Sequence, residues 1–91
     1  MPIYFIGLRR MYVYNIFLSK QAKKDLEEHR INEREVTIKV LEKLSYQKLS
    51  SKQDILALIT IEGTKYGAVG RKHGNTVTIT DVISNILIAD K

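Results

Sequence analysis

The sequence predicts an α+β domain: an N-terminal strand, two helices and then a three- to four-stranded antiparallel meander, with the helices on one face of the sheet. Three observations support this prediction. The chain has 91 residues, which is enough for one hydrophobic core between two layers. Its first half contains two segments with apolar residues at helical spacing, whereas its second half is rich in β-branched residues in alternation. Turn residues separate the segments of the second half, so consecutive strands are expected to form hairpins.

The first two elements are a strand and a helix that follow one another directly. Residues 12–18 are rich in β-branched and aromatic side chains and are therefore expected to form a strand. Ser19 is a good N-cap, and residues 20–29, which contain neither glycine nor proline, follow it. Ala22 and Leu26 lie one turn apart and form the apolar face of this segment. We therefore expect a short helix that begins after Ser19.

The second helix has the clearest boundary in the sequence. Asn32 is a favourable N-cap, and Glu35 stands three residues later, as in a capping box. Ile31 and Val36 are spaced to pack together as a hydrophobic staple. The other apolar positions of this segment also follow helical spacing: Val40, Leu41 and Leu44. We expect the helix to end near residue 45 and to pack on a sheet.

The second half of the chain predicts the meander. A polar connection at residues 46–52 comes first. The expected strands are, in chain order, 54–62, 65–71 and 76–84. Turns are expected at residues 63–64 and 72–75, where glycine and asparagine can adopt positive φ. A further short strand could follow at 86–88.

The alternation along residues 76–84 also predicts which side chains share a face. The first face carries Val77, Ile79 and Asp81, and the second carries Thr78, Thr80 and Val82. One of these faces is expected to be buried and the other to be exposed to solvent.

The charge of the chain is positive and unevenly distributed. Lysine and arginine number 15 against 10 aspartates and glutamates, which gives a net charge of +5 and a pI near 9.6. Through residue 53 there are eleven basic and six acidic residues, whereas the remainder holds four of each. A polyanion such as RNA is a natural partner for such a chain, although the same charge also keeps small proteins soluble.

Several classes of function are excluded by residues that the chain lacks. Without cysteine there is no disulfide framework, no thiolate zinc site and no cysteine nucleophile, which fits a reducing, cytoplasmic environment. The two histidines stand 44 positions apart, without carboxylates at ligand spacing, so no metal site is expected. No phosphate-binding loop, nucleotide fingerprint or membrane-length apolar segment is present, so we expect no cofactor and no membrane partner.

Residues 18–36 carry a pattern of a known family. They read LSKQAKKDLEEHRINEREV and resemble, without a gap, the strand-to-helix motif of the RelE/ParE toxin superfamily, most closely its small BrnT-like branch. The stretches KYGAVGR at 65–71 and GNTVTIT at 74–80 also resemble the paired C-terminal strands of that branch. The resemblance covers residues 12–84 and implies a RelE/ParE-like fold. It further implies binding or metal-independent cleavage of RNA by the toxin of a toxin-antitoxin pair, with an antitoxin-like protein as partner.

The chain departs from the family pattern at three positions in the first helix. Gln21 stands where the pattern has a histidine, Asp25 replaces the first arginine, and His29 replaces the second. The resemblance also begins only after residues 1–10, which leaves two interpretations open. These residues are either an extension of the shared core, or they precede a true start at Met11.

The candidate catalytic residues follow from what metal-free RNA cleavage needs, namely a base, an acid and a cation that stabilises the phosphorane. His29 and His73 are the side chains that ordinarily titrate near neutral pH, so they are candidates for proton transfer. Arg71 and Lys65 lie six positions apart on one strand, hence on one face, where with Tyr66 they could hold a phosphate. The expected catalytic residues are Arg71, His73, Tyr66 and His29, with Lys65 binding the nucleic acid.

A second basic group lies near the junction of the first strand and the first helix. Its members suit a nucleic-acid backbone: Arg9, Arg10, Lys20, Lys23 and Lys24. Aromatic side chains of the same region could stack on bases, although aromatic residues in strands usually pack in the core. These aromatic residues are Tyr4, Tyr12, Tyr14 and Phe17.

Each candidate also has a purely structural interpretation. His29 could interact with the last carbonyls of its helix, and His73 could be an ordinary hairpin residue. The cations could simply form a solvated face. Three hypotheses therefore stand: a toxin-like domain that binds or cleaves RNA, a non-catalytic module of the same fold that binds nucleic acid or protein, and a homodimer built on exposed sheet edges. RNA is expected ahead of DNA as the ligand.

Overall fold

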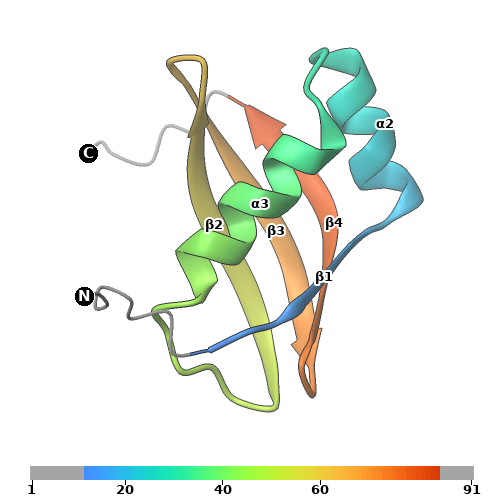
Figure 1. The fold of residues 1–91 in the computed structure, drawn as a ribbon. Coiled ribbons are helices and arrows are strands. Elements are labelled where there is room, and N and C mark those ends of the chain that lie inside the picture. The colour runs from blue at the N-terminus through green and yellow to red at the C-terminus, as the bar shows by residue number, and fades with distance from the viewer. Residues whose placement is uncertain (1–11, 85–91) are drawn as a thin grey trace, which may run out of the picture.

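The computed structural model describes residues 12–84, which form an α+β fold with two helices and one sheet (Figure 1). The elements are, in chain order, β1 (Asn15–Leu18), α2 (Lys20–Glu28), α3 (Glu33–Leu44), β2 (Lys52–Ile61), β3 (Thr64–His73) and β4 (Thr76–Ser84). The α+β class and the order of the elements are thus confirmed. Four predicted features lie outside the described residues: the extension at 1–10, Tyr4, the pair Arg9 and Arg10, and the strand at 86–88.

The four strands form one open sheet in the order β1-β4-β3-β2. β2 pairs with β3, and β3 with β4, in antiparallel hairpins, so the meander is confirmed. β1, however, runs parallel to β4 and pairs its residues Asn15–Leu18 with residues 76–79. The sheet is therefore mixed, and the expectation of a purely antiparallel arrangement was wrong. The periodicity of a strand indicates which face is buried, but it does not indicate which strand lies beside it.

Both predicted helix N-caps are confirmed. The Ser19 hydroxyl accepts a hydrogen bond from the Ala22 backbone N–H at 3.1 Å. The Asn32 side chain accepts from the N–H groups of Arg34 and Glu35 at 2.8 and 3.3 Å. These caps satisfy N–H groups that have no partner within the first turn of a helix. In residues 12–84 neither helix is long and apolar enough to cross a membrane.

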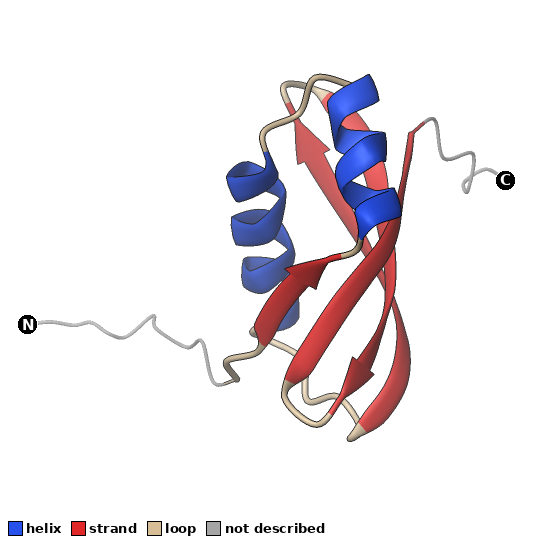
Figure 2. Cartoon of the chain, turned by 90° about the vertical axis from the view of Figure 1, so that its right-hand side faces the viewer, coloured by secondary structure: helices blue, strands red, loops and turns tan. Residues whose placement is uncertain are grey.

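The hydrophobic core lies between the helices and one face of the sheet. α3 runs across this face, and α2 lies beside β4, beyond the end of β1 (Figures 1 and 2). The helices contribute Ala22, Leu26, Val36, Val40 and Leu44 to the core. The strands contribute mainly Ile55, Ala57, Ile59, Ile61, Ala68, Val77, Ile79 and Val82. The opposite face of the sheet, here named the open face, is covered by neither helix.

A β-bulge in β4 changes the predicted alternation. Val69 pairs with Asp81, whereas the next residue of β3, Gly70, pairs with Ile79, so Thr80 is an extra residue in β4. After the bulge Val82 faces the core and is only 4% exposed. The prediction that Asp81 shares a face with Val77 and Ile79 was therefore wrong, because one extra residue reverses the two faces of a strand.

The β2–β3 hairpin turns one residue earlier than predicted. Glu62 and Gly63 have φ of 50° and 82°, which is typical of a two-residue type I′ turn. Ile61 and Thr64 pair directly on either side of it. The turn thus uses Glu62 and Gly63, and Thr64 already belongs to β3.

Candidate functional site

The open face of the sheet is apolar in its middle and charged at one end. Its exposed apolar side chains include Leu56, Leu58 and Ile83, which are 58%, 44% and 48% exposed. The charged end lies where β2 begins and β3 finishes. There Lys52 pairs across the strands with His73, and Asp54 pairs with Arg71.

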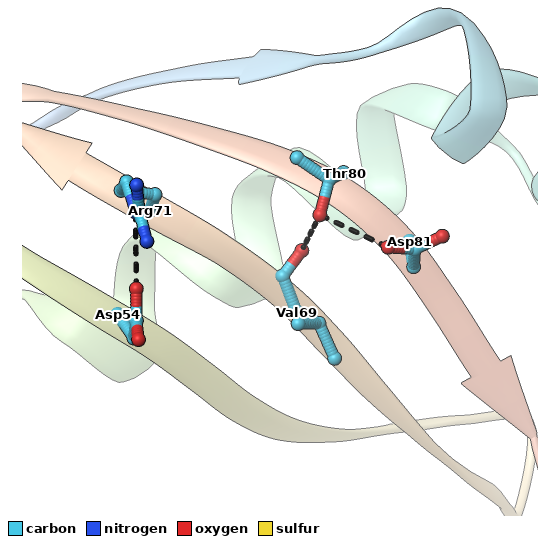
Figure 3. A network of polar contacts seen from close by, with 5 residues as sticks. All are labelled: Asp54, Val69, Arg71, Thr80 and Asp81. Atoms are coloured by element: carbon cyan, nitrogen blue, oxygen red, sulfur yellow. Dashed lines mark hydrogen bonds and ion pairs between the residues drawn. The ribbon is translucent and has the colours of Figure 1, made fainter.

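Three cationic or titratable side chains gather at this end, and we name Lys52, Arg71 and His73 the cation cluster. Together with Gln53 and Asp54 they line a shallow depression of about 400 Å³. The Arg71 Nε donates to the Asp54 carboxylate at 3.0 Å (Figure 3), and both side chains are mostly exposed. Two permanent cations thus face one carboxylate, which leaves the cluster with a positive charge.

The bulge shapes the surface on the other side of Arg71. The Thr80 hydroxyl lies 3.2 Å from the Val69 carbonyl oxygen and 3.0 Å from the Asp81 carboxylate (Figure 3). A second shallow depression, of about 450 Å³, is lined by Asp54, Val69, Gly70, Arg71 and Thr80. Arg71 and Asp54 line both depressions, so they stand between them.

An aromatic ring lies on the same face and in the same cross-strand row. Arg71 pairs with Thr78 of β4, and Thr78 pairs with Phe17 of β1. Two strand spacings, about 10 Å, therefore separate the backbones of Arg71 and Phe17. The Phe17 side chain is 57% exposed, whereas Tyr14 is buried and Tyr12 partly buried. Of the three aromatic candidates that the structure describes, Phe17 is thus the one available to a ligand.

The predicted catalytic residues divide into two groups. Arg71 and His73 lie two residues apart on the open face of β3. Tyr66 faces the core side instead and is 9% exposed, with its ring 5.7 Å from the His29 ring in an edge-on arrangement. His29 is the C-cap of α2, and its backbone N–H donates to the Asp25 carbonyl. The structure thus brings Arg71 to His73 and His29 to Tyr66, but it places the two pairs on opposite faces of the sheet.

The other predicted nucleic-acid contacts also separate. Lys65 shares the open face with Arg71, but six residues of strand place their backbones about 20 Å apart, too far for one phosphate. Lys20, Lys23 and Lys24 line a different shallow depression on α2, of about 480 Å³, together with Glu27 and Glu33.

Two residues that line the depression, Lys52 and Asp54, had no predicted role in the site. Lys52 was assigned to the connection before β2, and Asp54 was expected at the start of the strand. Their place follows from the register, which puts Lys52 beside His73 and Asp54 beside Arg71. A signal existed in the alternation of β2, which puts even-numbered residues on one face, but the partner strand and register were needed to use it.

Lys72 is a buried cation that sequence reasoning placed in a turn. Its side chain is 3% exposed, and its Nζ donates to the Ser50 carbonyl at 2.7 Å. The same Nζ lies 5.4 Å from the centre of the Tyr14 ring, a cation–π contact. The Tyr14 hydroxyl donates to the Gln47 carbonyl at 2.8 Å. Lys72 and Tyr14 therefore hold the connection between α3 and β2 against the sheet.

Asp25 has a structural role in this chain. Its carboxylate accepts a hydrogen bond from the Val82 backbone N–H of β4 at 3.0 Å. This bond is the main cause that lowers the pKa of Asp25 below its ordinary value, and smaller contributions come from Gln21, His29 and Lys24 against the opposing effect of burial. The ionised carboxylate of Asp25 thus stabilises β4.

Within residues 12–84 no three histidine, cysteine, aspartate or glutamate side chains lie close enough to hold a metal ion. Comparison with family models, with curated proteins and with solved structures finds no match to this chain.

Proposed function

We propose that this chain is a RelE/ParE-like domain that binds single-stranded RNA on the open face of its sheet. In this proposal the cation cluster contacts phosphates and Phe17 stacks on a base. The observation that carries it is the shared row and face of Arg71, Thr78 and Phe17, with Lys52 and His73 one row away. A positive groove beside an exposed aromatic ring is the usual combination for single-stranded nucleic acid.

The geometry supports binding better than cleavage. A phosphorane needs its acid, base and cation within hydrogen-bond reach of one phosphate. His29 and Tyr66 lie on the core side of the sheet, so of the predicted proton-transfer residues only His73 lies beside Arg71. Binding requires only the positive charge and the aromatic surface, both of which the open face supplies.

The element order adds a second line of support. A strand, two capped helices and an antiparallel meander agree with the fold that the resemblance implies. By the same resemblance an antitoxin-like protein remains the expected protein partner.

The test of RNA binding is fluorescence anisotropy with a short labelled single-stranded RNA, measured at several salt concentrations. Arg71→Ala should weaken binding by about tenfold, which corresponds to the loss of one charge-assisted contact. It should also reduce the slope of log affinity against log salt by about 0.7, the value for one phosphate on a single strand. Phe17→Leu should weaken binding without changing the slope, because it removes a ring and no charge.

Two variants make this test specific. Arg34→Ala also removes one arginine, but from the exposed surface of α3, and should leave affinity nearly unchanged. Asp54→Asn frees Arg71 from its ion pair and should tighten binding by about two- to fivefold, the size of an exposed ion pair. If Arg71→Ala and Arg34→Ala have equal effects, the cluster is no site. If the RNA is cut without added metal and His73→Ala abolishes the cutting, the domain is a ribonuclease rather than only a binder.

A further inference from the structure

β2 is a long strand at the edge of the sheet. It has ten residues, and β3 is its neighbour on one side. On its other side no strand lies beside it among residues 12–84. A free edge exposes backbone N–H and C=O groups that can pair with another strand.

The hairpin turn determines which backbone groups of β2 are free. In a two-residue type I′ hairpin the residues that flank the turn, here Ile61 and Thr64, form a hydrogen-bonded pair. Hydrogen-bonded and non-hydrogen-bonded pairs then alternate along the ladder. The odd-numbered residues of β2 therefore bond to β3, and the even-numbered residues from Lys52 to Thr60 point their N–H and C=O groups outward.

This edge lacks the features that usually protect an exposed strand. Between Ile55 and Ile61 there is no charged residue, no proline and no glycine. Leu56 and Leu58 lie on the open face of this stretch and are 58% and 44% exposed. Natural edge strands normally carry a lysine, a proline or a bulge that prevents pairing, whereas in β2 the charged residues, Lys52 and Asp54, lie only at its start. An unprotected edge of this kind is suited to a partner strand.

We propose that a second copy of this chain pairs with this edge, so that two β2 strands meet antiparallel about a two-fold axis at Ala57. In this register Leu56 lies opposite the partner's Leu58, and Leu58 lies opposite the partner's Leu56. Asp54 lies opposite the partner's Thr60, and Lys52 at the end of the strand comes near the partner's Glu62, which is in the turn after β2. The leucines thus meet across the interface, and the terminal charges are of opposite sign.

Neighbouring registers fit less well. A shift of two residues in one direction places Asp54 opposite the partner's Leu58, next to an apolar side chain. A shift of two in the other direction places Asp54 opposite the partner's Glu62, where like charges repel. A shift of one residue would join the open face of one copy to the core face of the other. The register about Ala57 is the one that matches both the leucines and the charges.

The flank of α3 offers further contact area along this edge. Lys39, Glu42, Lys43 and Tyr46 line a shallow groove of about 400 Å³ with residues 58–60 of β2. The groove contains both signs of charge and Tyr46, which is 64% exposed. A second copy would bring the same mixed set to the other side of the axis. Such flanking contacts would add buried surface to that of the strand ladder. This addition matters because a stable dimer needs about 800 Å² of buried surface per partner.

The first experiment is sedimentation of the full chain over a wide range of concentration. The chain should dimerise, and Leu58→Lys should raise the dissociation constant by at least about tenfold. Ile83→Lys is the matched control, since Ile83 is 48% exposed on the same face but on β4, and it should leave the dimer intact. A monomer at all concentrations, or a dimer lost in Ile83→Lys but not in Leu58→Lys, would overturn the proposal.

The second experiment tests the register in the folded protein, and it benefits from a chain without cysteine. Opposed residues in this register have Cα atoms about 5.5 Å apart, within the range of a disulfide. A mixture of Leu56→Cys and Leu58→Cys should therefore form a mixed disulfide dimer under mild oxidation. Each variant alone should cross-link far less, because a residue and its own copy lie on the diagonal, about 7–8 Å apart.

Equal cross-linking of the single variants and the mixture would contradict the register. A photoreactive residue at position 58 that captures residues 1–11 of the same chain would assign the edge to that segment and also overturn the proposal. The proposals of a dimer and of RNA binding can be disproved independently. Leu58→Lys leaves the cation cluster intact, and Arg71→Ala leaves the pairing of β2 intact.

Discussion

The two edges of this sheet differ in how far other elements of residues 12–84 cover them. On one side β1 pairs with residues 76–79 of β4, and α2 lies beside β4 beyond the end of β1. The Ser19 N–H donates to the Ile79 carbonyl at 2.9 Å, and its hydroxyl donates to the Thr80 carbonyl at 3.0 Å. Asp25 accepts from the Val82 N–H one turn further along. On the other side, β2 has none of these protections among the described residues.

The difference shows how the order of the elements along the chain determines whether a strand edge is covered. α2 follows β1 after a single residue, so its first turns necessarily run along β4, where Ser19 and Asp25 reach the free backbone groups. α3 instead lies across the face of the sheet and crosses β2 (Figure 1), so it does not run along the outer edge of β2 as α2 runs along β4. Side chains in the first turns of a helix can therefore cover one edge within the chain, whereas no strand of residues 12–84 lies beside the outer edge of β2.

The largest predicted effect concerns the bulge that shapes the protected edge. Gly70 lies beside it, and a Cβ there would overlap the Thr78 carbonyl oxygen and adjacent backbone of β4. Gly70→Ala should therefore lower the free energy of unfolding by about 3 kcal/mol or more, because backbone must move to relieve the overlap. Urea denaturation monitored by circular dichroism provides the measurement.

The control for this variant is Gly74→Ala. Gly74 has φ of 61° but no atom within 4 Å of an added Cβ. Its substitution should cost only the strain of a left-handed residue, about 1–2 kcal/mol. Equal losses in the two variants would show that close approach of β3 and β4 is not what requires Gly70.

The next effect removes the protection of β4 directly. Asp25→Ala leaves the Val82 N–H without its anionic acceptor and should lower the free energy of unfolding by about 1.5–3 kcal/mol. Glu28→Ala removes a carboxylate from the exposed surface of the same helix and should change stability by no more than about 0.5 kcal/mol. Thermal or urea unfolding of both variants checks the contrast, and equal losses would mean that Asp25 acts only as a surface charge.

The smallest effect is the pH dependence of this contact. Because the folded state lowers the pKa of Asp25, the folded protein keeps the carboxylate ionised at a pH where the unfolded chain is already protonated. The stabilisation is thus complete above about pH 4 and disappears as the pH falls below that value. The difference in unfolding free energy between wild type and Asp25→Ala should shrink accordingly in urea titrations at decreasing pH. A constant difference down to about pH 3 would contradict the assignment.

The sequence was most informative where a local signal determines a local structure. The N-caps Ser19 and Asn32 and the strand at 76–84 were predicted at the positions where they occur, because side-chain capping and β-propensity act over a few residues. Position 81 was assigned to the wrong face, since a bulge depends on the neighbouring strand. Lys72 was assigned to a turn, whereas the longer β3 turns it into the core beneath Tyr14.

The candidate site was predictable only in part. Arg71 and His73 were found from their chemistry, and their two-residue spacing on one strand already placed them together. Lys52, Asp54 and Phe17 joined them only through pairing with β3 and β4, which links residues far apart in the sequence. Tyr66 and His29 lie on the other side of the sheet and therefore do not belong to that site.

By itself the sequence determined the α+β class, the order of the elements, the helix boundaries and the positive charge, because each depends on composition or on neighbours along the chain. The tertiary structure alone decided that β1 runs parallel to β4, that a bulge turns Val82 inward and that one sheet edge is covered while the other has no neighbouring strand among residues 12–84. Strand pairing is a contact between distant residues, and local propensity carries no information about which strands will meet.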